Sequence, residues 1–227
     1  MSAGTPARRG AADLPLGWAS QAAVERLGTA LGGTSVRATA LQAFDTLPTE
    51  SNLLFTGYVD LRAADVEAAS LLLPPAAIGE LPAGELPDGA AALLHISSRG
   101  VRVHLGTEAR AAGLTVTPLA GERPLAGAAS DRLTALVGAC WNLGIVVSLP
   151  SGRLSAPIVI RVESPSPGEA LLARIAVELG AGASAAISEE VIGADVGVAP
   201  RSGATASALL ATSSEVTLAA GARLRLS

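Results

Sequence analysis

One pattern, V-x-L-x-x-G, occurs three times in the second half of the chain, as Val147-Ser-Leu-Pro-Ser-Gly152, Val177-Glu-Leu-Gly-Ala-Gly182 and Val216-Thr-Leu-Ala-Ala-Gly221. The first two copies start 30 residues apart and the last two start 39 apart. Each copy is a short β run with a turn of small residues, and a second β run follows. Because one strand–turn–strand unit cannot bury its own apolar face, such units stack on one another. The pattern predicts a β-solenoid; chance similarity in a sequence rich in alanine, glycine, valine and leucine is the alternative.

The last of these second β runs shows the alternation best. Leu224 and Leu226 fall on one face of the run, and Arg223 and Arg225 fall on the other. A period of two residues is typical of a strand with one buried face.

The composition is that of a globular protein with a core of small side chains. Of the 227 residues, 49% are hydrophobic, which suffices for one large domain or two small ones. All sixteen basic residues are arginine. The absence of lysine from the sequence excludes a P-loop, a Schiff-base lysine and a Ser-x-x-Lys nucleophile.

Charge and cysteine content indicate the compartment and exclude some partners. The net charge of −4 and the five aromatic residues disfavour nucleic-acid binding. Cys140 is the only cysteine, so an intramolecular disulfide is excluded and a reducing compartment fits. No apolar segment follows the arginines of residues 1–13, so we expect no signal peptide and a cytoplasmic protein.

Residues 133–152 carry no charge and have the length of a membrane span. However, the stretch contains Asn142, Pro150 and several glycines, and its first half has helical spacing whereas its second half resembles a strand. The sequence therefore predicts a buried helix–strand junction, with a transmembrane helix as the alternative.

The expected secondary structure changes near residue 91, from mainly helical to mainly β. Before it, the sequence predicts helices over 17–31 and 62–73, a helix or strand over 36–44, a strand over 53–58 and a linker over 74–92. After it, the sequence predicts a hairpin of strands 92–96 and 101–105, a β run over 115–117 and a helix at about 130–142. We therefore expect an N-terminal helical or mixed region, 1–91, and a region of β-helix rungs with one inserted helix, 92–227.

Ser130 is the expected N-cap of that inserted helix, and Asp131 favours its positive end. One apolar stripe is expected at Leu133, Leu136, Val137, Cys140 and Trp141.

The sequence from Asp131 through Trp141-Asn-Leu-Gly144 to Ala156-Pro157-Ile resembles the SufB/SufD family of iron–sulfur cluster assembly proteins. In that family, a helix ending in an aromatic residue and a glycine leads into a β run with V-P-x-G-V and x-P-I. Residues 173–183 are similar to the family's R-x-x-I-x-x-x-x-G-A rung. Tyr58-Val-Asp-Leu61 keeps part of an upstream family phrase but lacks its threonine. The resemblance covers roughly residues 37–227 and is closer to SufD.

The resemblance implies a mainly β fold with N-terminal helices, namely a right-handed parallel β-helix, in a protein about half as long as family members. It implies a non-catalytic scaffold subunit whose partners are SufB-like and SufC-like (ABC ATPase) subunits, with an iron–sulfur cluster held only at the level of the complex. The helical segment that docks SufC is expected to be missing from this fragment. No position matches the family's cluster-related residues, so we expect no catalytic, cofactor-binding or metal residues here.

The residues that could in principle bind a metal or a cofactor, or act in catalysis, are each expected to have a structural role instead. Cys140 lies on the apolar stripe and is expected in the core. His95 and His104 lie on neighbouring expected strands and could meet a metal with Glu108, although hairpin positions without that role are favoured. Adjacent strand residues Glu189 and Glu190 point to opposite faces and form a poor acid–base pair. Gly180-x-Gly182 is expected to be a tight corner rather than a dinucleotide motif.

Two other functions are compatible with a solenoid. An enzyme acting on polysaccharide or acyl groups would need a groove, for which Asp195, Arg201 and Glu215 are the candidates. A structural solenoid would self-assemble by stacking its end rungs head to tail.

Overall fold

The computed structural model describes residues 16–47, 69–73, 77–125, 129, 131–193 and 208–227. The protein is a mixed α/β structure with two sheets, which combines the expected β structure with the expected N-terminal helices. The helices are α1 (Gln21–Leu31), α2 (Thr34–Thr46), α4 (Thr107–Ala111), α5 (Arg132–Cys140) and the short 3-10 helix η2 (Ala83–Glu85).

The first sheet, sheet A, contains β1 (Ser70–Leu71), β5 (Thr115–Pro118), β6 (Leu143–Leu149), β8 (Glu169–Leu179) and β10 (Leu209–Leu218). Strand β8 pairs in parallel with β1, β6 and β10, and β5 pairs with β6 in the antiparallel sense.

The second sheet, sheet B, contains β2 (Ile78–Glu80), β3 (Ala92–Ser97), β4 (Gly100–Leu105), β7 (Ile158–Glu163), β9 (Ser184–Ile192) and β11 (Arg223–Leu226). Its strand order is β11-β9-β7-β3-β4-β2, and only β3 and β4 pair in the antiparallel sense.

From β6 onward the backbone alternates between the two sheets, and each strand pairs with the strand two places later. The register places Val147 opposite Val177, and Val177 opposite Val216. The three copies of the sequence pattern are therefore equivalent positions in neighbouring strands. The longer second interval arises in the connection from β9 to β10, which includes residues 194–207 outside the described part.

The glycine that ends each copy has a physical role. Gly152, Gly182 and Gly221 have φ angles of 83°, 69° and 73°, which residues with a Cβ rarely adopt. A Cβ on Gly180 would lie 1.9 Å from the carbonyl oxygen of Pro150 in the preceding turn. The predicted tight corner at Gly180-x-Gly182 is thus confirmed.

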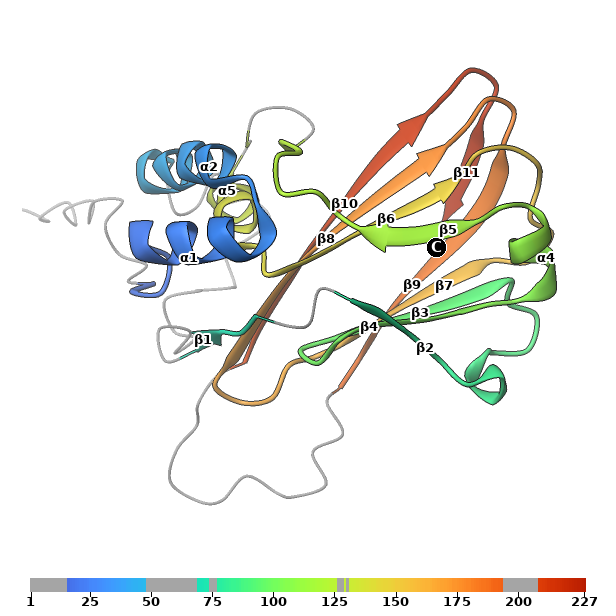
Figure 1. The fold of residues 1–227 in the computed structure, drawn as a ribbon, viewed down its shortest axis with the longest axis horizontal. Helices are drawn as coiled ribbons and strands as arrows, with labels where there is room; N and C mark the ends of the chain where they lie inside the picture. The colour runs from blue at the N-terminus through green and yellow to red at the C-terminus, as the bar shows by residue number, and fades with distance from the viewer. Residues whose placement is uncertain (1–15, 48–68, 74–76, 126–128, 130, 194–207) are drawn as a thin grey trace, which may run out of the picture.

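Three layers result, with the long helices on one side of sheet A and sheet B on the other (Figure 1). Alternate residues of β6 and β8, such as Val147 and Val177, fill the space between the sheets. The opposite face of β8, including Leu172 and Ala176, packs with α1, α2 and α5 in a second cluster. Both faces of β8 are covered, and this explains its nearly continuous apolar sequence.

Several expected elements are confirmed. Strands β3 and β4 form the predicted hairpin, and β5 is the predicted β run at 115–117. The segment 36–44 is helical, within α2. The uncharged stretch 133–152 is a helix–strand junction, formed by α5 and β6. Among the described residues, no helix is long and apolar enough to cross a membrane.

Other expectations need correction. The prediction of a helix over 62–73 is wrong at the end that the structure describes, because Ser70–Leu71 pairs with β8 as a strand. The rest of that segment, 62–68, and the predicted strand 53–58 lie outside the described residues. Asp131, not Ser130, is the N-cap of α5, since its Oδ1 accepts from the backbone N–H of Thr134 at 2.7 Å. Leu133 is 49% exposed, although Arg132 and Ala135 on the same turn of α5 are buried, so Leu133 lies on the outer face of the helix and not on the expected apolar stripe.

The predicted division near residue 91 stays a prediction. The segment 74–92 contains β2 and η2, and β2 pairs with β4. Helices α1 and α2 share one apolar cluster with α5 and sheet A.

Candidate functional site

The junction between α5 and β6 concentrates the buried polar groups of the described residues. Arg37, Asn142 and Arg174 are the buried polar or charged side chains there, each at most 2% exposed. Arg132 is also buried, but it lies at the other end of α5, where its guanidinium carbon is 4.3 Å from the centroid of the Phe44 ring. The guanidinium carbons of Arg37 and Arg174 lie 4.0 and 5.7 Å from the ring centroid of Trp141, which is itself 1% exposed. Buried charged groups could serve a function at this junction. The hydrogen bonds that these side chains make decide whether they are available for binding or catalysis.

Arg37 joins α2 to the end of α5. Its Nη1 donates to the carbonyls of Ala139 and Trp141 at 3.3 and 2.8 Å, and its Nε donates to the carbonyl of Gly32 at 3.0 Å. The last carbonyls of a helix have no partner within the helix, and a cation there also interacts favourably with the helix dipole. The guanidinium carbon lies 4.0 Å from the centroid of the Trp141 ring. The guanidinium of Arg37 therefore caps the C-terminal end of α5.

Arg174 lies on β8, beneath the loop before α5. It is 1% exposed and donates to Glu215 Oε1 from Nε at 3.0 Å and from Nη2 at 2.5 Å. It also donates to the carbonyls of Arg123 and Pro124 at 2.8 and 3.1 Å. The charge is thus neutralised by the neighbouring strand β10, and the guanidinium fixes the loop on sheet A.

Asn142 completes sheet A between the ends of two strands. Its Nδ2 donates to the carbonyls of Leu72 and Ala170, both at 2.8 Å, and its Oδ1 accepts from the N–H of Leu172 at 2.8 Å. Strands β1 and β6 both pair with β8, and this amide fills the gap between them. The side-chain amide makes the hydrogen bonds that a backbone amide would make at this position of the sheet. The role of the side chain is therefore structural.

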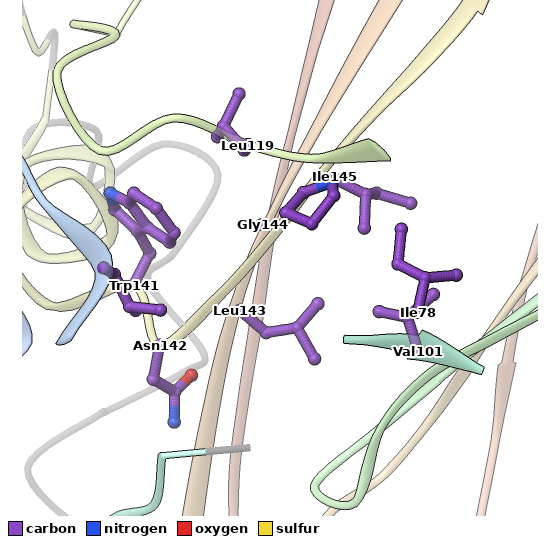
Figure 2. Close-up of a pocket in the computed structure, with 10 residues that line it drawn as sticks. Ile78, Val101, Leu119, Trp141, Asn142, Leu143, Gly144 and Ile145 are labelled. Atoms are coloured by element: carbon purple, nitrogen blue, oxygen red, sulfur yellow. The ribbon is translucent and has the colours of Figure 1, made fainter. Parts of the chain in front are cut away.

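A small cavity of about 30 Å³ adjoins the junction. Figure 2 shows it between Trp141 and Asn142 on one side and Ile78 and Val101 on the other. This volume accommodates one or two water molecules. Because Asn142 already uses its amide in the sheet, the cavity offers little to recognise a larger ligand.

Cys140 is buried, as expected from its place on the apolar stripe of α5. Burial raises the pKa of its thiol to about 12, although the neighbouring Arg37 guanidinium acts in the opposite direction. Burial likewise lowers the pKa of Arg37 to about 10. Cys140 is therefore a neutral thiol at physiological pH, and a thiolate is what metal binding requires.

We expect Cys140 to make the protein less stable at alkaline pH. Its ordinary pKa is 9.0, and the folded state raises that value to about 12. The folded state therefore holds the proton more tightly, and its stabilising effect, complete below pH 9, is lost as the pH rises toward 12. Between pH 7 and 10, the free energy of unfolding should fall by about 1.4 kcal/mol more in the wild type than in Cys140→Ala. Urea titrations of both proteins at each pH measure this difference; parallel pH profiles would contradict the assignment.

The two histidines do not meet at a metal site. His95 Nε2 lies 3.0 Å from Glu163 Oε2, and its Nδ1 lies 3.3 Å from Arg102 Nη2. His104 Nδ1 lies 3.2 Å from the carbonyl of Leu81. Within the described residues, no group of three or more His, Cys, Asp or Glu side chains could hold a metal ion.

Glu108, the third member of that set, is engaged elsewhere. The backbone N–H of Ser155 donates to its Oε1 at 2.6 Å, and this hydrogen bond lowers the pKa of the carboxyl. It thus connects α4 to the turn between β6 and β7.

The acidic candidates of the later strands are also separated. Glu189 accepts from the hydroxyl of Ser214 at 2.8 Å, whereas Glu190 pairs with Arg161 at 2.9 Å. The two carboxylates thus point to opposite faces of β9, as predicted. Glu215 is bound to Arg174, and Asp195 and Arg201 lie outside the described residues.

Sequence reasoning did not single out Arg37, Arg174 or Asn142 as the principal polar residues. For Arg174, one sign was present: it is the only charged residue between Ala170 and Val177 in an otherwise apolar strand. Such an interruption indicates a buried, paired cation.

No protein-family model matches this sequence, and no curated protein matches it.

Proposed function

We propose that the protein is a non-catalytic, cytoplasmic scaffold subunit of a Suf-type iron–sulfur cluster assembly complex. In this proposal the strands from β6 onward are coils of a right-handed parallel β-helix. SufB-like and SufC-like subunits are the partners, and the cluster belongs to the assembled complex rather than to this subunit.

The observation that carries the proposal is the register of the repeated pattern. Val147, Val177 and Val216 lie side by side in parallel strands of sheet A. In each of the three copies, the strand ends shortly after this valine and the backbone passes to sheet B. Stacked strand–turn–strand units are the architecture that the resemblance to SufB/SufD implies. The resemblance is strongest where α5 leads into β6, and the structure has a helix followed by a strand at that place.

The state of the buried polar groups supports a scaffold rather than an enzyme. Arg37, Asn142 and Arg174 are used in hydrogen bonds that hold helices, strands and loops together. Cys140 is a neutral core thiol. A rigid frame of this kind presents surfaces to other subunits without chemistry of its own.

The test is co-expression of the tagged protein with SufB-like and SufC-like proteins, followed by affinity purification and size-exclusion chromatography. We expect a stable complex that contains all three proteins, and we expect the SufB-like subunit to be retained when the SufC-like subunit is left out. A tagged protein that purifies alone in both experiments contradicts the proposal.

A self-assembling solenoid is the second candidate, and the last strand–turn–strand unit favours it. Val216, Leu218 and Leu226 are 41%, 48% and 57% exposed, although their counterparts in the preceding unit are buried. Light scattering of the protein without partners distinguishes the two: growth of the particle mass with concentration supports self-assembly, and a constant monomer mass supports the scaffold.

A further inference from the structure

Three arginines gather on the outer face of sheet B near the glycine corners. Arg153 and Arg223 both pair with Ser184, from opposite sides, and Arg225 follows two residues after Arg223. Their neighbours Leu154 and Leu224 pack between the sheets, so alternation directs the three arginines outward. We call Arg153, Arg223 and Arg225 the arginine face.

The register fixes the spacing of the arginine face. Neighbouring strands lie about 4.8 Å apart, so the backbones of Arg153 and Arg223 lie about 10 Å apart. Two residues along a strand span about 7 Å, which separates Arg223 from Arg225. The strand positions beside them carry the small side chains of Ser184 and Ala186. Three exposed arginines thus lie around strand positions that carry only small side chains.

These three cations differ from the other arginines of the stacked strands. Arg161 pairs with Glu190, and Arg174 pairs with Glu215. By contrast, the arginine face is exposed, and no ion pair joins it to a carboxylate in the described part of the protein. Glu108, which contacts the turn that follows Arg153, accepts a hydrogen bond from the backbone of Ser155. The arginine face is therefore an exposed group of cations without an ion-paired carboxylate in the described part of a protein whose net charge is −4.

We propose that the arginine face is a docking surface for an acidic segment of a partner protein. Charge complementarity identifies the partner, because guanidinium groups form two parallel hydrogen bonds with a carboxylate. Strands β7, β9 and β11 contain no aromatic residue on which bases could stack, so the surface favours carboxylates over single-stranded nucleic acid. The proposal does not depend on the Suf-type function.

The test uses the full-length protein and a fluorescent polyglutamate peptide in an anisotropy titration at low salt. We expect binding that weakens as salt is added. The variant Arg223→Gln/Arg225→Gln should bind at least about tenfold more weakly, and the addition of Arg153→Gln should weaken binding further. Because all three side chains are exposed, we expect the variants to keep the wild-type circular dichroism spectrum.

The matched control is Arg99→Gln/Arg110→Gln, which removes the same charge from exposed arginines elsewhere. It should change the affinity less than about twofold. Equal weakening by both double variants, or no peptide binding at low salt, would overturn the proposal. So would an oligothymidylate of equal charge that binds more tightly than the peptide through the same arginines, since that result assigns the surface to nucleic acid.

Discussion

Replacing Asn142 with leucine is expected to lower the free energy of unfolding by about 3–5 kcal/mol. The substitution keeps the branched outline of the side chain, with two methyl groups in place of the amide oxygen and nitrogen, but removes every hydrogen bond that the amide makes. The carbonyls of Leu72 and Ala170 and the N–H of Leu172 then lose their partners inside sheet A. Each buried polar group without a partner costs about 1–3 kcal/mol. Urea unfolding followed by circular dichroism measures the loss.

Ser148→Ala is the matched control, because Ser148 lies on the same strand, β6, and is only partly buried. It should change the stability by less than about 0.5 kcal/mol. A loss below about 1 kcal/mol for Asn142→Leu would show that water satisfies the freed groups and that the amide does not hold β1 on the sheet.

Replacing Arg174 with methionine should cost about 3–5 kcal/mol as well, for a different reason. Glu215 is only 10% exposed, so removal of its partner leaves a carboxylate in a place that water barely reaches. The carbonyls of Arg123 and Pro124 lose their donors at the same time. Thermal or urea unfolding at neutral pH provides the measurement.

Two comparisons make the Arg174 prediction specific. Arg161→Met breaks a similar pair on sheet B, but Arg161 and Glu190 are 30% and 41% exposed, so its cost should stay below about 1 kcal/mol. The double variant Arg174→Met/Glu215→Leu should recover much of the loss, because no buried charge is then left unpaired. A double variant whose loss equals the sum of the two single losses would contradict this explanation.

The parts of the fold that follow local rules could be predicted from the sequence. The pattern V-x-L-x-x-G predicted the equivalence of Val147, Val177 and Val216, because residues that face the same layer recur with the strand and its turn. The hairpin 92–105 and the helix before Trp141 followed from turn residues and apolar spacing in the same way.

The parts that depend on distant neighbours could not be predicted. The strand at Ser70–Leu71 exists because β8 offers it a free edge, and nothing in its own residues says so. Arg37 and Asn142 look ordinary on their own segments; their burial comes from Trp141 and Leu172, which are distant in sequence or on another strand. A polar side chain in the interior is fixed by partners that only the folded protein assembles.

The corners between the stacked strands differ in their tolerance of inserted sequence. At the glycine side, successive turns are bonded directly, as where the N–H of Ser184 donates to the carbonyl of Gly152. One additional residue there would send the following strand's apolar side chains to solvent. The connections on the other side, 164–168 and 193–208, differ widely in length, yet the strands beyond them keep the common register. A foreign loop, tag or folded module grafted into this protein therefore belongs in the connection 193–208.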